Sequence, residues 1–171
     1  PQWYLFSEYV RYCGGTPIMI ETRQADGYQP DPAEIRARWT DRTRAILINT
    51  PSNPTGAVYT RSILEEIAQF ALEKNLYVIA DEVYDRIVYE GAKHVSIASL
   101  DAEIAARCVT INSVSKTHAM TGWRVGYMTM PAELVQKGAH LQGMITSGAA
   151  GICQKAAVAA LTGDQSHVKR W

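Results

Sequence analysis

Short runs of apolar residues recur along the chain and alternate with stretches that have a helical period. The runs fall at residues 16–20, 45–49, 76–80, 108–112 and 125–130. Continuous apolar runs of this length are typical of strands that are buried on both faces of a sheet. Their alternation with helices predicts an α/β protein in which a mostly parallel sheet is flanked by helices.

The clearest helix is predicted at residues 60–75, with Thr60 as its N-cap. Its apolar residues recur at the helical period and therefore share one face. They are Ile63, Leu64, Ile67, Phe70 and Ala71. Further helices are predicted at residues 32–39, where a proline opens the first turn, and at residues 131–144 and 151–161.

The composition is that of a globular protein without a charge bias. Hydrophobic residues make up 47% of the 171 residues, and 17 basic residues balance 17 acidic ones. This neutrality argues against nucleic acid or an anionic membrane surface as the main partner. No apolar stretch approaches the roughly 18 residues that span a bilayer, and no basic segment followed by an apolar run opens the chain. We therefore expect a cytoplasmic protein.

Cysteine and histidine show no ligand spacing. The three cysteines are far apart, no CxxC pair occurs, and the four histidines form no cluster. We therefore expect neither a disulfide framework nor a bound metal, which fits a reducing cytosol.

Polar clusters follow three of the predicted strands, at residues 49–56, 81–84 and 113–116. In open α/β sheets, ligands bind in the crevice at the carboxyl ends of the strands. We therefore expect these clusters to form one shared site.

Two ionisable residues in these clusters are candidates for chemistry. Asp81 ends a buried strand, where an unpaired charge costs several kcal/mol, so it needs a cation, a metal or several donors. The adjacent Glu82 would permit a magnesium site, but the chain has no GxxxxGK[ST] loop for nucleotide phosphates. Lys116 is either a solvated loop lysine or a desolvated amine that can form a Schiff base.

The neighbouring residues allow a binding interpretation and a structural one. Ser113, Ser115 and Arg124 could grip a phosphate, or the serines could cap a turn beside a surface arginine. Asn53 and Tyr84 could donate hydrogen bonds into the crevice, or belong to a tight turn and to the packed interior.

Three ordered motifs together resemble a known family. SNPTG at residues 52–56, DEVY at 81–84 and SVSKTHAMTGWRVG at 113–126 are similar to the class I/II pyridoxal-phosphate (PLP) aminotransferases, the aspartate aminotransferase-like group of fold type I. The resemblance covers essentially the whole chain. It implies a PLP enzyme that transfers an amino group from an amino acid to a 2-keto acid by a ping-pong mechanism, and that acts as a homodimer.

The resemblance also implies the residues that perform the chemistry. Lys116 would be the Schiff-base lysine and proton shuttle, and Asp81 would pair with the protonated pyridine nitrogen of PLP. Tyr84 and Asn53 would hydrogen-bond the 3′-oxygen of the cofactor. A cis peptide bond is expected between Asn53 and Pro54.

The remaining cofactor contacts follow in the same way. Ser113, Ser115 and Arg124 would bind the phosphate, and Trp3 resembles the aromatic residue that stacks on the pyridine ring. We expect residues 1–171 to form a single domain, the central part of the large PLP-binding domain, without the N-terminal segment and the C-terminal small domain. The isolated chain should then lack the arginine that binds the substrate carboxylate and be inactive.

Neighbouring activities share these motifs. A PLP-dependent lyase or synthase of the same fold is one alternative, and a PLP-binding regulatory module is another. The tyrosine of DEVY and the TGWRVG run favour transamination. The absence of arginine between residues 136 and 150 mildly disfavours one way of binding a dicarboxylate substrate.

Overall fold

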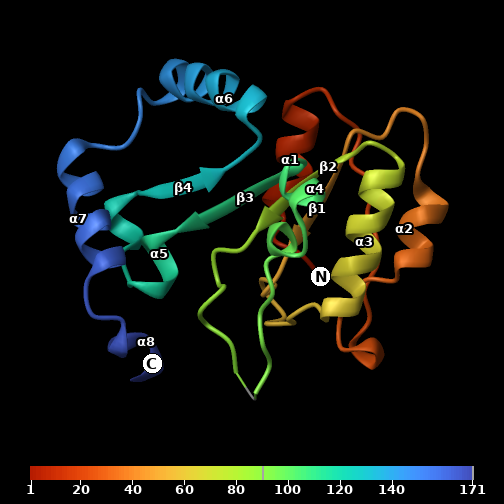
Figure 1. Ribbon diagram of the computed structural model, residues 1–171, viewed down its shortest axis with the longest axis horizontal. Helices are drawn as coiled ribbons and strands as arrows, with labels where there is room; N and C mark the ends of the chain where they lie inside the picture. The colour runs from red at the N-terminus through yellow and green to blue at the C-terminus, as the bar shows by residue number, and fades with distance from the viewer. Residues whose placement is uncertain (90, 171) are drawn as a thin grey trace.

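A four-stranded sheet forms the centre of the computed structural model, which describes residues 1–89 and 91–170 (Figure 1). Its strands are adjacent in chain order: β1 Ala45–Asn49, β2 Tyr77–Asp81, β3 Cys108–Ser113 and β4 Gly126–Thr129. β1, β2 and β3 are parallel, whereas β4 is antiparallel to β3. The prediction of a mostly parallel sheet is thus confirmed, and four of the predicted strands are present.

The strand predicted at residues 16–20 is wrong. This run is extended but pairs with no described strand. The side chains of Ile18 and Met19 are 48% and 42% exposed. A strand needs a neighbour to satisfy its N–H and C=O groups, and an apolar pattern alone does not supply one.

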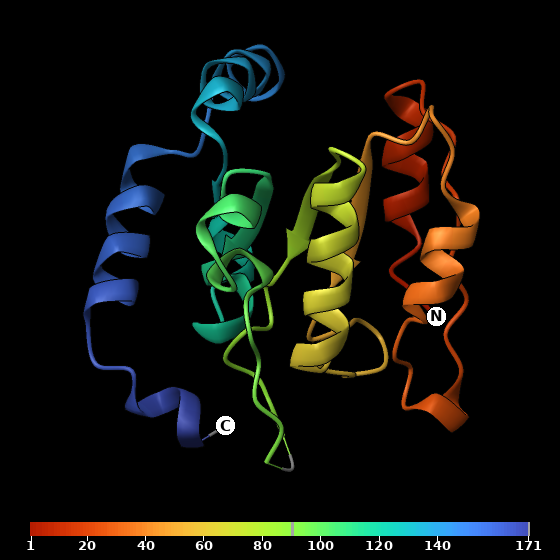
Figure 2. The ribbon, with the colours of Figure 1, turned by 45° about the vertical axis from the view of Figure 1, so that its right-hand side comes forward.

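The helices lie on both sides of the sheet. α1, α2 and α3 lie beside β1 and β2, whereas α6 and α7 lie beyond β4 (Figures 1 and 2). The helices are α1 Leu5–Tyr12, α2 Pro32–Arg38, α3 Arg61–Glu73, α4 Ala102–Ala105, α5 Val114–Thr117, α6 Ala132–Ile145, α7 Gly151–Thr162 and α8 Ser166–Arg170. Short 3₁₀ helices lie at η1 Gln24–Asp26, η2 Ile97–Ser99 and η3 Thr121–Trp123. α2, α3, α6 and α7 confirm the predicted helices.

The main core lies between α3 and one face of the sheet. The apolar face of α3 buries Leu64 and Ile67 against Val78 and Ala80 of β2, together with residues of η2 and α4. A second, smaller cluster joins α5, α7 and the start of β4. Among the described helices, none combines the length and the apolar character needed to cross a membrane.

Replacing Thr60 with alanine should lower the free energy of unfolding by about 1 kcal/mol, the usual cost of losing an N-cap. The Thr60 side chain accepts a hydrogen bond from the Ile63 N–H at the start of α3. Urea unfolding measures the change. Thr16→Ala is the matched control, because Thr16 is exposed and lies outside any helix or strand. Equal losses in the two variants would contradict the capping role.

Candidate functional site

The register of the sheet brings the polar strand ends onto one face. Asn49 pairs with Asp81, and Asp81 pairs with Ile111, two residues before Ser113. Side chains alternate along a strand, so Asn49, Asp81 and Ser113 lie on the same face. Ala80, which packs against α3, lies on the opposite face. The candidate site therefore lies at the carboxyl ends of β1, β2 and β3, on the face away from the main core.

Asp81 is a partly buried carboxyl group that forms no ion pair among the described residues. Its Oδ1 accepts a hydrogen bond of 3.2 Å from the Val83 N–H. Burial raises the pKa of Asp81, and the nearby Glu82 charge raises it further, whereas the Val83 hydrogen bond and the Lys116 charge lower it. No ion pair to Asp81 occurs in residues 1–89 and 91–170. A cationic N–H group bound here would relieve the cost of its burial.

Lys116 lies in the single turn of α5, which directly follows β3 (Figure 1). Its Nζ lies 5.5 Å from the centroid of the Tyr84 ring, so the ammonium faces the aromatic ring. The side chain of Lys116 is exposed, and the described residues do not bury it as the desolvated-amine interpretation required. The structure thus joins Lys116, Tyr84 and Asp81 in one open site.

Ser113 caps α5, as the structural interpretation of the two serines predicted. Its Oγ accepts a hydrogen bond of 2.9 Å from the Ser115 N–H. Its single proton can go to Ser115 Oγ at 2.7 Å or to the Val125 carbonyl at 2.9 Å. When Ser113 donates to Ser115, the Ser115 hydroxyl proton is free for an acceptor such as a phosphate oxygen.

Arg124 lies beside these serines. It precedes Val125, whose carbonyl Ser113 contacts, and its backbone has a left-handed φ of 53°. One guanidinium N–H group donates to the Thr121 carbonyl at 2.8 Å. In the part of the chain that the structure describes, the other N–H groups have no partner. These N–H groups are exposed to solvent and can donate hydrogen bonds to an anion.

Asn49 is a site residue that the sequence reasoning missed. It is only 8% exposed, and its amide is bonded at both ends. Asn49 Oδ1 accepts from the Asn53 N–H at 2.8 Å, and Nδ2 donates to the Asp81 carbonyl at 3.2 Å. Asn49 therefore ties the SNPTG loop to the end of β2. The available signal was a polar residue at the end of an apolar strand, the same signal that singled out Asp81.

The Asn53 loop and Tyr84 leave polar groups for a ligand. The Asn53–Pro54 bond is cis, as predicted, and the Thr50–Pro51 bond is also cis. Within residues 1–89 and 91–170, neither the Asn53 carboxamide nor the Tyr84 hydroxyl has a hydrogen-bond partner. Both groups are half-buried, so a bound acceptor or donor would satisfy them.

Glu82 does not share the site with Asp81. Strand alternation turns its side chain toward the main core, where it is 4% exposed. Its Oε2 lies 3.4 Å from His94 Nε2. The geometry therefore separates the two carboxyl groups that a magnesium site would need. In the described residues, no group of three or more His, Cys, Asp or Glu side chains could hold a metal ion.

Trp3 lies in an aromatic cluster at the start of the chain. Its ring contacts are with Tyr4, Phe6 and Tyr9 in the same segment, and the Phe6 centroid lies 5.4 Å away. These contacts leave the stacking role of Trp3 a prediction.

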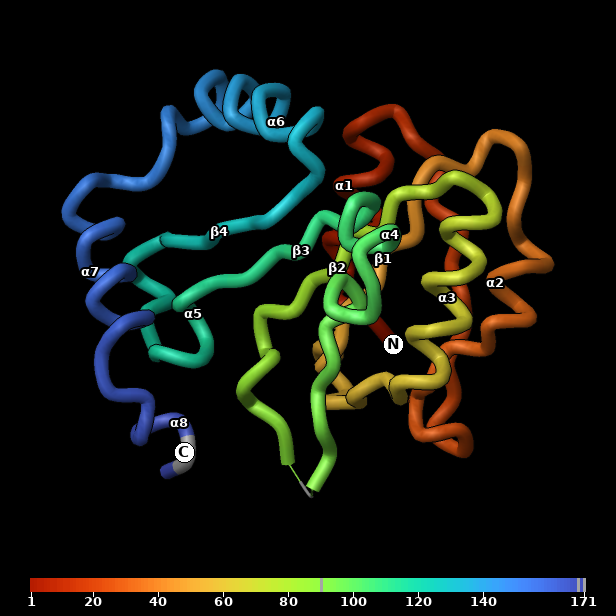
Figure 3. Tube along the Cα trace, in the orientation of Figure 1, coloured from red at the N-terminus to blue at the C-terminus, as the bar shows by residue number. Residues whose placement is uncertain are grey.

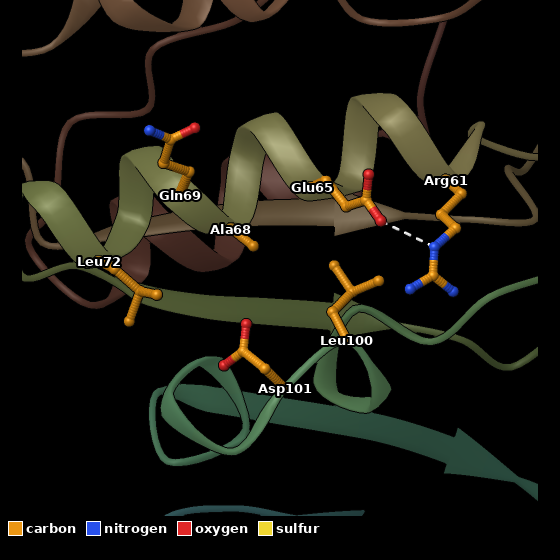
Figure 4. Close-up of a pocket in the computed structure, with 7 residues that line it drawn as sticks. All are labelled: Arg61, Glu65, Ala68, Gln69, Leu72, Leu100 and Asp101. Carbon is orange, nitrogen blue, oxygen red and sulfur yellow. Dashed lines mark hydrogen bonds and ion pairs between the residues drawn. The ribbon is translucent and has the colours of Figure 1, made fainter.

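A separate pocket lies between α3 and the turn from η2 to α4 (Figure 4). Arg61 and Glu65 border it, with an ion pair of 2.7 Å between Arg61 Nε and Glu65 Oε1. Leu100 and Asp101 face them from the other side. None of the predicted site residues lines this pocket, so it is distinct from the site at the strand ends.

The chain is similar to known proteins over almost its whole length. The model of the aminotransferase class I and II family matches residues 1–170. The chain is 41% identical over 169 residues to the aspartate aminotransferase of Bacillus sp. (strain YM-2), covering 99% of this chain and 43% of that protein. It is 38% identical over 166 residues to the aspartate/prephenate aminotransferase of Thermus thermophilus, with 97% and 42% covered.

Solved structures show the same similarity. The aromatic aminotransferase of Pyrococcus horikoshii OT3 superposes with a TM-score of 0.95 at 39% identity, covering 99% of this chain and 46% of that one. The aspartate aminotransferase of Thermus thermophilus with maleate gives a TM-score of 0.91 at 37% identity, with 99% and 43% covered. The chain thus spans less than half the length of these relatives. Its sheet and flanking helices match part of the fold type I large domain, and the chain belongs to the class I and II aminotransferase family.

Proposed function

We propose that this chain provides the PLP-binding residues of an aminotransferase that moves an amino group from an amino acid to a 2-keto acid. The observation that carries the proposal is the meeting of Lys116, Tyr84 and Asp81 at adjoining strand ends. A nucleophilic amine, a phenol and a carboxylate with a raised pKa are the groups that such chemistry needs. Family membership supports the same activity.

The donor set fits PLP group by group. Among the described residues Asp81 forms no ion pair, and a protonated pyridine nitrogen would provide one. The unpartnered Asn53 amide and Tyr84 hydroxyl suit the 3′-oxygen of the ring. For the phosphate, the free N–H groups of Arg124 and the hydroxyl of Ser115 are suitable donors, while Ser113 acts mainly as the cap that orients Ser115.

When bound, PLP supplies an electron sink for the bonds at the α-carbon of the substrate. Lys116 would hold the cofactor through Nζ, and its free amine would move the proton between the substrate α-carbon and the cofactor. Asp81 would keep the pyridine nitrogen protonated. Tyr84 would donate to the 3′-oxygen and, through its ring, keep the Lys116 ammonium close.

The substrate class and the assembly are further parts of the proposal. The names of the relatives include aspartate, aspartate/prephenate and aromatic aminotransferases, so we propose amino acids and 2-keto acids as the substrate class. We also propose a cytoplasmic homodimer. Apolar side chains that are more than half exposed on α6 and α7, among them Met144 and Ile152, support an assembly that covers them.

Borohydride reduction in the presence of PLP, followed by peptide mass mapping, tests the proposal. Reduction makes the bond between Nζ and the cofactor permanent, and we expect the phosphopyridoxyl adduct on Lys116 of the full-length protein. Lys137 and Lys155 are exposed and serve as internal controls for non-specific labelling. Equal labelling of the three lysines, or no adduct at all, would overturn the proposal.

A further inference from the structure

The side-chain amide of Gln165 joins three segments that are distant in the sequence. Its Oε1 accepts a hydrogen bond of 2.9 Å from Arg86 Nη1 and lies 3.1 Å from His118 Nε2. Its Nε2 donates to the carbonyls of Ala160 and Gly163, both at 2.8 Å. The chain after β2 descends toward the side on which α5 and α8 lie (Figure 3). The hydrogen bonds of Gln165 connect these parts.

The hydrogen bonds determine the orientation of the amide. Two carbonyls surround Nε2, so only the NH₂ group fits there, and the oxygen must face Arg86 and His118. Arginine can only donate. His118 must then carry a proton on Nε2 in order to donate to that oxygen. His118 Nδ1 is buried and has no hydrogen-bond partner in the part of the chain that the structure describes.

The two partners of Gln165 each follow a residue of the proposed active site. Arg86 lies two residues after Tyr84, and His118 lies two residues after Lys116. We propose that Gln165 is a positioning residue that holds the Tyr84 loop against the Lys116 turn. Its effect on catalysis rests on the proposed function, whereas its effect on the two segments does not.

The first test uses the protein without cofactor. ¹⁵N NMR of the histidine rings should show His118 as the Nε2–H tautomer at neutral pH, and Gln165→Ala should abolish that preference. Gln154→Ala is the matched control, because Gln154 is an exposed glutamine on α7 whose amide bonds only the Ala149 carbonyl. A His118 ring without a proton on Nε2, or no change in Gln165→Ala, would overturn the proposal even if PLP never binds.

The second test uses the full-length protein with PLP. Gln165→Ala should lower kcat by about tenfold with little change in KM, because misplacing reacting groups slows the chemistry more than the binding. It should also shift the pH titration of the bound-cofactor absorption band, which a purely structural defect would leave unchanged. Gln154→Ala should leave both unchanged.

A double variant then tests whether Arg86 and Gln165 act together or independently. If Arg86 acts through Gln165, Arg86→Ala combined with Gln165→Ala should have the same kcat as Gln165→Ala alone. Arg86→Lys, which keeps a donor, should restore most of the activity lost in Arg86→Ala. Multiplying effects in the double variant would contradict the bridge. Failure of PLP to bind the unaltered protein would contradict the proposed function instead, and the NMR result would still decide the role of Gln165.

Discussion

Replacing Lys116 with alanine is expected to abolish amino transfer, with kcat reduced by about 10⁴-fold or more. The substitution removes both the amine that would hold the cofactor and the base that would move the substrate proton, and proton transfer alone commonly contributes 10²- to 10⁴-fold. The measurement is single-turnover kinetics in the full-length protein with saturating PLP and an amino acid.

Two further variants isolate the cause of that loss. Lys116→Arg keeps a cation over the Tyr84 ring but removes the nucleophilic amine, so it should be as inactive as the alanine variant. Lys137→Ala removes an exposed lysine of α6 and should keep full activity. Substantial turnover in either Lys116 variant would refute its assignment as the cofactor-binding lysine.

Replacing Asp81 with asparagine is expected to lower kcat by about 10²- to 10³-fold, the range for losing one preorganised electrostatic contact at a reacting group. The asparagine keeps the size of the side chain but not the charge that would hold a proton on the pyridine nitrogen. PLP affinity should fall far less, because the contacts of Arg124 and Ser115 with the phosphate would persist. A loss in affinity as large as the loss in kcat would contradict the separation of these roles.

The same substitution should change the pH dependence of stability in the protein without cofactor. Burial raises the pKa of Asp81, so the folded chain binds this proton more tightly than the unfolded chain does. That contribution to stability is fully present below the ordinary aspartate pKa of about 4, and it is lost as pH rises through the raised value. Asp81→Asn lacks this loss and should gain stability relative to the unaltered protein as pH rises.

Urea unfolding of both proteins between acid and neutral pH measures this difference. Asp26→Asn is the control, since Asp26 is exposed on η1 and its replacement should leave the difference flat. A stability difference for Asp81→Asn that stays constant with pH would show that burial does not penalise the Asp81 charge. A lower kcat together with a gain in stability at neutral pH in Asp81→Asn would show that the charge of Asp81 favours activity and lowers the stability of the folded chain.

Much of the fold could be predicted because its signals are local. β1 to β3 follow continuous apolar runs, and α3 follows one apolar face and an N-cap at Thr60. The run at residues 16–20 carries the same signal as these strands, yet it stays exposed. A strand requires hydrogen bonds to a neighbouring strand, and the apolar pattern of one run does not indicate whether such a strand lies beside it.

The candidate site divides in the same way. Lys116, Asp81, Tyr84 and Asn53 could be named because each closes or follows an apolar strand within a short motif. The serines were left with two interpretations, and only the structure showed Ser113 capping α5. Glu82 and Asp81 are adjacent in sequence, but the alternation of β2 sends them to opposite faces of the sheet.

The sequence by itself determined the four strands of the sheet, the main helices and the residues at the strand ends, because the period of the apolar positions and short motifs encode them. Only the tertiary structure decided which of these residues meet. Asn49 reaches the Asp81 carbonyl because β1 and β2 are in register, and Gln165 contacts Arg86 across 79 positions of sequence. Such contacts depend on how helices and strands pack together, and side-chain packing is a property of the folded chain rather than of any short segment.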